Sequence, residues 1–227
     1  MPRAPWTCFL ALLACAACAV SLRAQPFELD REVAEAAADQ DRGDCAAAES
    51  RLRAVVQALQ ATQATEERIA QALNLLASAC HDGGKYREAE EFYREALRRL
   101  DGGGAGRSLA RVRVLNNLGN LKCETADYPE AEQLLEDALA LAAATAGRDR
   151  PQVATCWNNL GRLRLEQDRL DEAEEMYTQA HALLEKHFGP KHPHLTAARN
   201  NLAALYREQG KLAEAEALQR QVIEELK

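Results

Sequence analysis

The sequence Asn-Asn-Leu-Gly recurs at a fixed spacing of 42 residues. It occupies Asn116–Gly119 and Asn158–Gly161, and it returns as Asn-Asn-Leu-Ala at Asn200–Ala203. A weaker copy, Asn-Leu-Leu-Ala, covers Asn74–Ala77. A constant period between about 20 and 50 residues is typical of stacked, equivalent supersecondary units. The chain is therefore predicted to be a repeat protein.

A second motif follows each of these copies and ends in Ala-Glu. Its copies are Gly84–Glu90, Ala126–Glu132, Asp168–Glu174 and Gly210–Glu216, with a fainter one at Gly43–Glu49. Apolar residues recur every three to four positions on both sides of the motif, which places them on one face of a helix. The break between the two apolar stretches is so short that it permits only an antiparallel helical hairpin. We therefore predict an all-α fold, an α-solenoid of about five antiparallel helix pairs.

Small residues recur at one level of each predicted helix pair. Gly119 and Gly161 occupy it in the first helix, and Ala131 and Ala173 occupy it in the second. A larger side chain at a close helix crossing would cost about 1–3 kcal/mol through overpacking. We expect the paired helices to approach each other closely at these residues.

These motifs resemble the tetratricopeptide repeat (TPR). The order Leu-Gly, then Tyr or Leu, then Ala is similar to that family, and the Tyr-x-Glu-Ala-Glu sequence of Tyr86–Glu90 argues against HEAT and armadillo repeats of similar length. The period, the doubled asparagine and the loop Gly189–Pro193 resemble the kinesin light chain type. The resemblance implies a TPR superhelix. Its predicted units are a degenerate repeat at 25–62 and four repeats at 63–104, 105–146, 147–188 and 189–227.

The first 24 residues differ in character from the rest. Arg3 precedes the uncharged, apolar segment Thr7–Leu22, and the small residue Ala24 precedes charged sequence, which predicts a signal peptide at 1–24. The protein is then exported, either periplasmic or secreted. An uncleaved anchor and a lipoprotein anchored at Cys15 are the alternatives. No later segment approaches the roughly 18 apolar residues of a membrane span, so none is expected after signal removal.

Composition and motifs exclude several functions. The formal net charge is −7 and the pI is near 5.4, whereas a nucleic-acid partner requires a basic surface. The run Gly102–Gly106 follows a predicted helix instead of a strand, which indicates a linker and not a phosphate-binding loop. No catalytic triad or dyad is indicated by spacing. We expect neither an enzyme nor a cofactor.

The doubled asparagines form two rows along the repeats. Asparagine is a mediocre helix former, so its repetition within helices suggests a use. In related repeats the second row, here Asn117, Asn159 and Asn201, faces the concave groove and contacts bound peptide. An amide can both donate to and accept from the main chain of an extended peptide. A structural bond between neighbouring helices is the other interpretation, and it suits the first row better. The resemblance also places further side chains in the groove: Arg113, Asn120, Thr155, Arg162 and Arg207.

One acidic residue lies at the C-terminal end of the first helix in each of the four repeats. These residues form an acidic row: Asp82, Glu124, Glu166 and Glu208. Anions are disfavoured near a helix C-terminus. Local pairing with Lys85, Arg169 and Lys211, each three residues further on, would offset that cost. A basic ligand is the alternative interpretation of the row.

The cysteines and histidines permit few predictions. Cys45 and Cys80 lie at adjacent ends of antiparallel helices, so a disulfide between them is conceivable. Cys123 and Cys156 are expected to be unpaired, because about 13 Å separates them along the helix direction. The histidines around Gly189 could ligate zinc. His192 belongs to the loop that matches the repeat family, so we expect no metal site.

The sequence supports two functional hypotheses. The first is a protein–protein interaction module that binds an extended peptide or partner segment in the concave groove. The second is a self-assembling structural protein of the cell envelope. Its self-association would use the C-terminal helix, where Leu218, Val222 and Ile223 have no following repeat to cover them.

Overall fold

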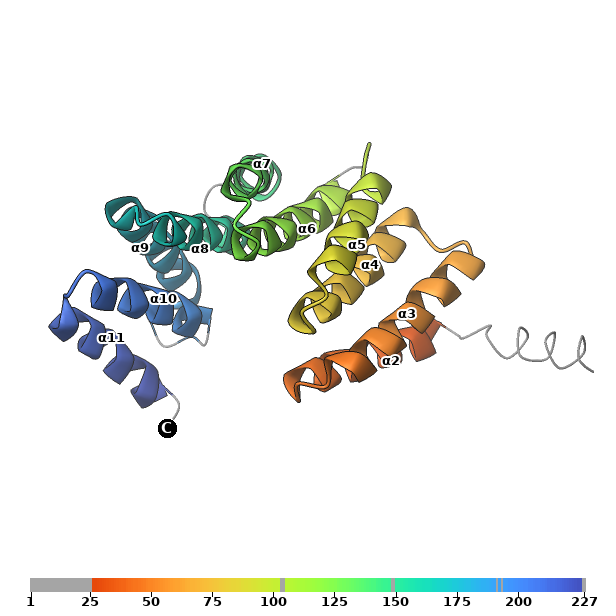
Figure 1. Cartoon of the computed structure of the whole chain (residues 1–227), viewed down its shortest axis with the longest axis horizontal. Helices are drawn as coiled ribbons and strands as arrows, with labels where there is room; N and C mark the ends of the chain where they lie inside the picture. Colours follow the sequence, from red (N-terminus) through yellow and green to blue (C-terminus); the bar gives the residue numbers. More distant parts are fainter. Residues whose placement is uncertain (1–25, 103–104, 148–149, 191, 193, 226–227) are drawn as a thin grey trace, which may run out of the picture. The chain divides into compact units, whose positions relative to one another are not determined.

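The computed structural model describes residues 26–102, 105–147, 150–190, 192 and 194–225. Within these ranges the chain forms ten α-helices and no strand (Figure 1). The predicted all-α class is therefore confirmed. The predicted signal peptide lies outside the described residues. No helix in the described ranges is both long enough and apolar enough to span a bilayer.

The helices follow one another as five hairpins, each joined by a short turn. The pairs are α2 (Pro26–Asp41) with α3 (Cys45–Ala61), α4 (Glu66–Asp82) with α5 (Tyr86–Arg99), α6 (Ala105–Glu124) with α7 (Tyr128–Ala146), α8 (Pro151–Glu166) with α9 (Leu170–Phe188), and α10 (His194–Glu208) with α11 (Leu212–Glu225). The chain divides into two compact units, Met1–Phe92 and Tyr93–Lys227, which are called unit 1 and unit 2 below.

One turn geometry joins the helices of all five pairs. The second residue before the new helix adopts a left-handed backbone, with φ of 78° at Gly43, 74° at Gly84 and Gly210, and 59° at Ala126 and Asp168. The next amide donates back to the ending helix, as in the 2.8 Å bond from the Lys211 nitrogen to the preceding helix. This closure satisfies one of the carbonyls that a helix C-terminus leaves without a partner. Glycine suits the left-handed conformation, whereas alanine and aspartate adopt it at a cost.

The paired helices of unit 2 touch at the predicted small residues. A Cβ atom added to Gly119 would lie 2.7 Å from Leu135 side-chain atoms, and one added to Gly161 would lie 2.8 Å from ring atoms of Tyr177. Ala131 is fully buried at the first of these crossings. The predicted close approach is therefore confirmed. Larger residues at these levels would force the helices apart.

The last helix is only partly covered. Leu218 of α11 packs against a buried cluster that includes Tyr177 and Leu205. Leu212 and Ile223, in contrast, are 66% and 55% exposed. The prediction of an uncovered apolar face therefore holds for Ile223 but not for Leu218, because Leu218 points back into unit 2.

The basic residues after the acidic row do not form the expected local pairs. Lys85 Nζ lies 2.7 Å from Glu49 Oε2, and Lys211 Nζ lies 2.8 Å from Glu174 Oε2. Both glutamates end the second motif of the preceding repeat. Arg169 pairs with Glu172 at 2.6 Å and not with the acidic row. The long cationic side chains of Lys85 and Lys211 thus reach across to the neighbouring hairpin.

Candidate functional site

A cavity of about 540 Å³ lies within unit 2. Four helices contribute to its wall: α6, α8, α9 and α10. Its lining side chains are Val112, Arg113, Asn116, Pro151, Gln152, Thr155, Asn158, Asn159, Leu184, Phe188, Ala197 and Asn201. The wall combines an apolar part, to which Leu184 and Phe188 contribute, with a row of amide side chains. A concave, partly apolar surface with a few polar groups is the usual form of a ligand site.

The eight side chains predicted for the groove separate into two groups. Four of them line the cavity: Arg113, Thr155, Asn159 and Asn201. The other four are not among its lining residues: Asn117, Asn120, Arg162 and Arg207. Whether any of these side chains contacts a ligand stays a prediction.

Arg162 is engaged with the preceding repeat. Its guanidinium donates to the main-chain oxygen of Asn120 at 3.1 Å and to Glu124 Oε1 at 3.3 Å. Glu124, a member of the acidic row, is therefore paired with an arginine of the following repeat. Arg162 connects α8 to the C-terminal end of α6, so the geometry favours a structural role for it.

The first asparagine row differs from one repeat to the next. Asn116 is only 4% exposed, and its Nδ2 donates to the Val112 main-chain oxygen at 3.1 Å and to Cys156 Sγ at 3.3 Å. Its Oδ1 accepts a 2.9 Å hydrogen bond from Asn159 Nδ2. The structural interpretation of the first row therefore describes Asn116 well. Asn158 also lines the cavity, but its buried Oδ1 has no hydrogen-bond partner in the described part of the chain.

The aromatic part of the cavity was not predicted. Phe188 ends α9, and its ring stacks on His192 with centroids 4.5 Å apart, while His187 meets it edge-on at 4.6 Å. The predicted groove positions all lie on the first helix of a repeat, whereas Leu184 and Phe188 belong to a second helix, α9. The placement of Phe188 directly before the Gly189 loop could have indicated it.

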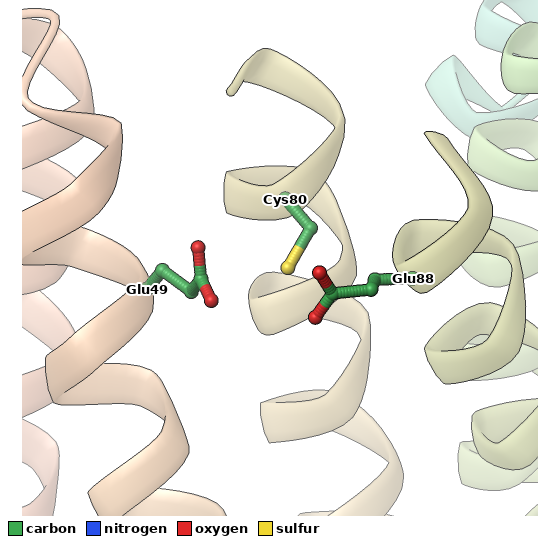
Figure 2. Close-up of side chains that lie close together, drawn as sticks. All are labelled: Glu49, Cys80 and Glu88. Atoms are coloured by element: carbon green, nitrogen blue, oxygen red, sulfur yellow. The ribbon is translucent and has the colours of Figure 1, made fainter. Parts of the chain in front are cut away.

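A second group of chemically capable side chains lies in unit 1. Potential ligand atoms of Glu49, Cys80 and Glu88 all lie within 4.8 Å of one another, and Figure 2 shows them on three neighbouring helical segments. Arg53 pairs with both carboxylates, at 2.8 Å from Glu49 and 2.5 Å from Glu88, and Lys85 pairs with Glu49. Burial raises the pKa of the Cys80 thiol to about 11, which opposes formation of the thiolate that metals bind. We interpret this group as a partly buried ion-pair network, in which Glu49 is buried and Arg53, Lys85 and Glu88 reach the surface.

The four cysteines in the described residues are free thiols. The structure therefore contains no disulfide between Cys45 and Cys80, contrary to the one considered from the sequence. Cys80 Sγ lies instead beside the carboxylates of Glu49 and Glu88. Cys123 and Cys156 are buried within unit 2, and burial raises the pKa of both thiols.

Solved structures with similar folds include kinesin light chain-type proteins. BtubC (BKLC) from P. vanneervenii is 25% identical, with a TM-score of 0.69 over 88% of this chain and 82% of that chain. A Podosopora anserina protein with nearly identical TPR-like repeats, of the kinesin light chain kind, is 25% identical, with a TM-score of 0.65 over 89% of this chain and 96% of that chain. A Rap protein complexed with Competence and Sporulation Factor shares the fold at 17% identity, with a TM-score of 0.71 over 86% of this chain and 52% of that chain.

Family models identify the repeats directly. Three models, each described as tetratricopeptide repeat, match residues 70–99, 111–186 and 195–225, which together make up more than half of the chain. No curated protein sequence matches this chain. Repeats of this family typically act as non-catalytic protein–protein interaction modules. The chain belongs to the tetratricopeptide repeat proteins, and its 42-residue repeats are similar to those of kinesin light chains.

Proposed function

We propose that the protein binds an extended segment of a partner protein in the cavity of unit 2. The observation that carries this proposal is the combination of side chains in the cavity wall. Asn158 and Asn201 offer amide groups there, and Phe188 offers an apolar surface. An amide hydrogen-bonds a main chain of any sequence, because it both donates and accepts. The apolar surface would take a side chain of the same segment.

The charge of the cavity wall limits which peptide segments can bind there. Arg113 is the one charged residue among the lining side chains that the structure describes. A segment with a long run of basic residues would meet this arginine, whereas an uncharged or mildly acidic segment would not be repelled. We expect the bound segment to carry one apolar side chain flanked by uncharged or acidic residues.

A selection experiment tests the proposal. Random linear peptides are displayed on phage and selected on the purified chain, and the affinity of a selected peptide is measured by fluorescence anisotropy. Phe188→Ala is expected to weaken binding more than tenfold, as for a buried aromatic anchor, and Asn201→Ala about fivefold to tenfold. Asn200→Ala is the matched control, because Asn200 is exposed and lies outside the cavity lining.

Circular dichroism of each variant separates lost binding from lost fold. Peptides that bind Phe188→Ala and Asn201→Ala as tightly as the unchanged chain would contradict the proposal. A selection that yields no binding peptide would do so as well.

A second candidate function is self-assembly through α11, as a structural protein of the envelope. The observation that favours it is the exposure of the apolar side chains of Leu212 and Ile223 on α11. A second copy of the chain could cover this surface. The protein would then form chains or dimers and not merely bind a partner.

Light scattering distinguishes the two functions. Self-assembly predicts a mass that rises with concentration and falls to that of a monomer in Leu212→Glu with Ile223→Glu. Leu218→Glu is unsuitable for this test, because Leu218 packs against the buried cluster around Tyr177. A constant monomeric mass in the unchanged chain would exclude this function and leave the peptide-binding proposal intact.

We also propose that the protein is exported, on the strength of the apolar leader in residues 1–24. Expression in a bacterial host followed by cell fractionation tests this. Export predicts a product in the periplasm or medium whose mass lacks the leader. A lipid-modified product cut before Cys15 would instead support the lipoprotein alternative, and an uncut cytoplasmic product would contradict export.

A further inference from the structure

One buried residue of α10 departs from the repeat pattern. Arg199 is only 3% exposed, whereas the residues at the same position of the earlier repeats are all apolar: Leu73, Leu115 and Trp157. Leu73 and Leu115 are buried like Arg199. Burial of a charged group is costly unless hydrogen bonds replace its contacts with water. The guanidinium at this position therefore needs an explanation other than packing.

Arg199 is hydrogen-bonded to the turn that follows α9. Its Nη2 donates to the main-chain oxygen of Pro190 at 2.5 Å. In the same turn the main-chain oxygen of His192 accepts a 2.9 Å hydrogen bond from the nitrogen of Leu195, in the first turn of α10. The backbone of Pro190 and that of His192 are thus both tied to α10. A leucine at position 199, as in the earlier repeats, could not make the bond to Pro190.

The same turn supports the aromatic part of the cavity wall. The ring of His192 stacks on that of Phe188, with centroids 4.5 Å apart and 20° between the ring planes. Phe188 lines the cavity, but His192 and Arg199 are not among the lining residues. Any effect of these two residues on a ligand in the cavity therefore passes through the position of the Phe188 ring.

We infer that Arg199 is a positioning residue of the proposed binding site. It holds the turn at Pro190, so that His192 remains stacked on Phe188 and the Phe188 ring is fixed in the cavity wall before a ligand binds. This inference rests on the proposed function, in which Phe188 contacts an apolar side chain of the bound segment. A side chain that is ordered in advance loses less conformational entropy on binding, which raises the affinity.

Replacement of Arg199 by the residue of the earlier repeats tests the inference. The probe is a peptide selected on the unchanged chain, with its affinity measured by fluorescence anisotropy. Arg199→Leu should weaken binding about fivefold, the effect of one lost hydrogen bond. Its free energy of unfolding should not fall, because leucine suits this buried position and the exposed Pro190 can bond to water instead. An arginine with a purely structural role would give the opposite result, a lower stability with unchanged affinity.

A second variant tests the path through His192. His192→Ala should weaken binding as much as Arg199→Leu, and the two substitutions together should weaken it no further, since both release the same ring. Nuclear Overhauser contacts between the ring protons of Phe188 and His192 should be present in the unchanged chain and lost in Arg199→Leu. Arg31→Leu is the control and should bind the peptide as the unchanged chain does, because Arg31 is exposed in unit 1 and does not line the cavity.

Arg199→Met keeps the experiment decisive if Arg199→Leu does not fold, because an unbranched methionine fills similar space without the guanidinium. Unchanged affinity in the folded Arg199 variant, or additive effects of that variant and His192→Ala, would overturn the inference. If Phe188→Ala still weakens binding strongly in that case, the proposed function survives. Binding that is indifferent to Phe188→Ala would instead refute the proposed function.

Discussion

Asn159 Nδ2 donates a 2.9 Å hydrogen bond to Asn116 Oδ1, which joins the second asparagine row of one repeat to the first row of the repeat before it. The bond connects α8 to α6. Asn116 completes its bonding with the Val112 carbonyl and the Cys156 thiol. The repeated asparagine doublet is therefore partly a structural link between hairpins.

Removal of this link should destabilise the fold. Asn116→Ala deletes the acceptor for Asn159 and the donor to Cys156 in a buried place, so we expect the free energy of unfolding to fall by about 1–3 kcal/mol. Urea denaturation followed by circular dichroism measures it. Asn200→Ala, at the exposed equivalent position, should change stability by no more than about 0.5 kcal/mol. Equal effects of the two substitutions would contradict the structural role of Asn116.

The close helix crossing at Gly161 should not accept a larger residue. Gly161→Val would place its Cβ 2.8 Å from the Tyr177 ring, so the pair of helices must separate. We expect a loss of about 1–3 kcal/mol in the free energy of unfolding, measured by thermal or urea denaturation. Ala217→Val, on the exposed face of α11, introduces the same side chain into a helix without this contact. The prediction fails if both substitutions have the same small effect.

The ion pair between Glu174 and Lys211 should make the free energy of unfolding depend on pH in the acidic range. Hydrogen bonds from Lys211 and then Gln209 lower the pKa of Glu174 in the folded chain. A lowered pKa stabilises the fold above the ordinary pKa of glutamate, and this contribution is lost as the pH falls through the lowered value. Lys211→Met should therefore be less stable near neutral pH and should converge with the unchanged chain in acid.

Denaturation at a series of pH values checks this. The contribution of this ion pair to the free energy of unfolding is also lost at alkaline pH. The hydrogen bond to Glu174 raises the pKa of Lys211, and the contribution disappears as the pH rises through that raised value. A constant difference between Lys211→Met and the unchanged chain at every pH would contradict the prediction.

Thiol labelling should separate the cysteines by burial. Cys45 is half-buried, whereas Cys80 is buried and the pKa of its thiol is raised to about 11 by burial, so very little thiolate is present at neutral pH. We expect iodoacetamide to label Cys45 in the folded chain and Cys80 only after unfolding. Peptide mapping by mass spectrometry measures both. A Cys45 that is labelled only after reduction would instead support the disulfide between Cys45 and Cys80.

The sequence alone determined the architecture of this protein. A 42-residue period, two apolar stripes per period and small residues at Gly119 and Gly161 predict stacked helical hairpins, because each follows from local periodicity or from the size of one residue. The hairpins and their close crossings appear as predicted. Of the predicted groove residues, Arg113, Asn159 and Asn201 line the cavity of unit 2, whereas Asn117, Asn120 and Arg162 do not. Contact of any of them with a ligand stays a prediction.

Only the tertiary structure decided what equivalent residues do. Asn116 and Asn158 hold the same position in successive repeats, yet Asn116 is hydrogen-bonded through both amide atoms, whereas Asn158 Oδ1 has no hydrogen-bond partner in the described residues. Cys156 accepts a hydrogen bond from Asn116, and Ala198, the residue 42 positions after Cys156, has no acceptor in its side chain. Lys85 likewise pairs across repeats and not along its own turn. A repeat sequence specifies which positions are equivalent. The partner of each side chain depends on its neighbour in the next hairpin, which the period does not contain.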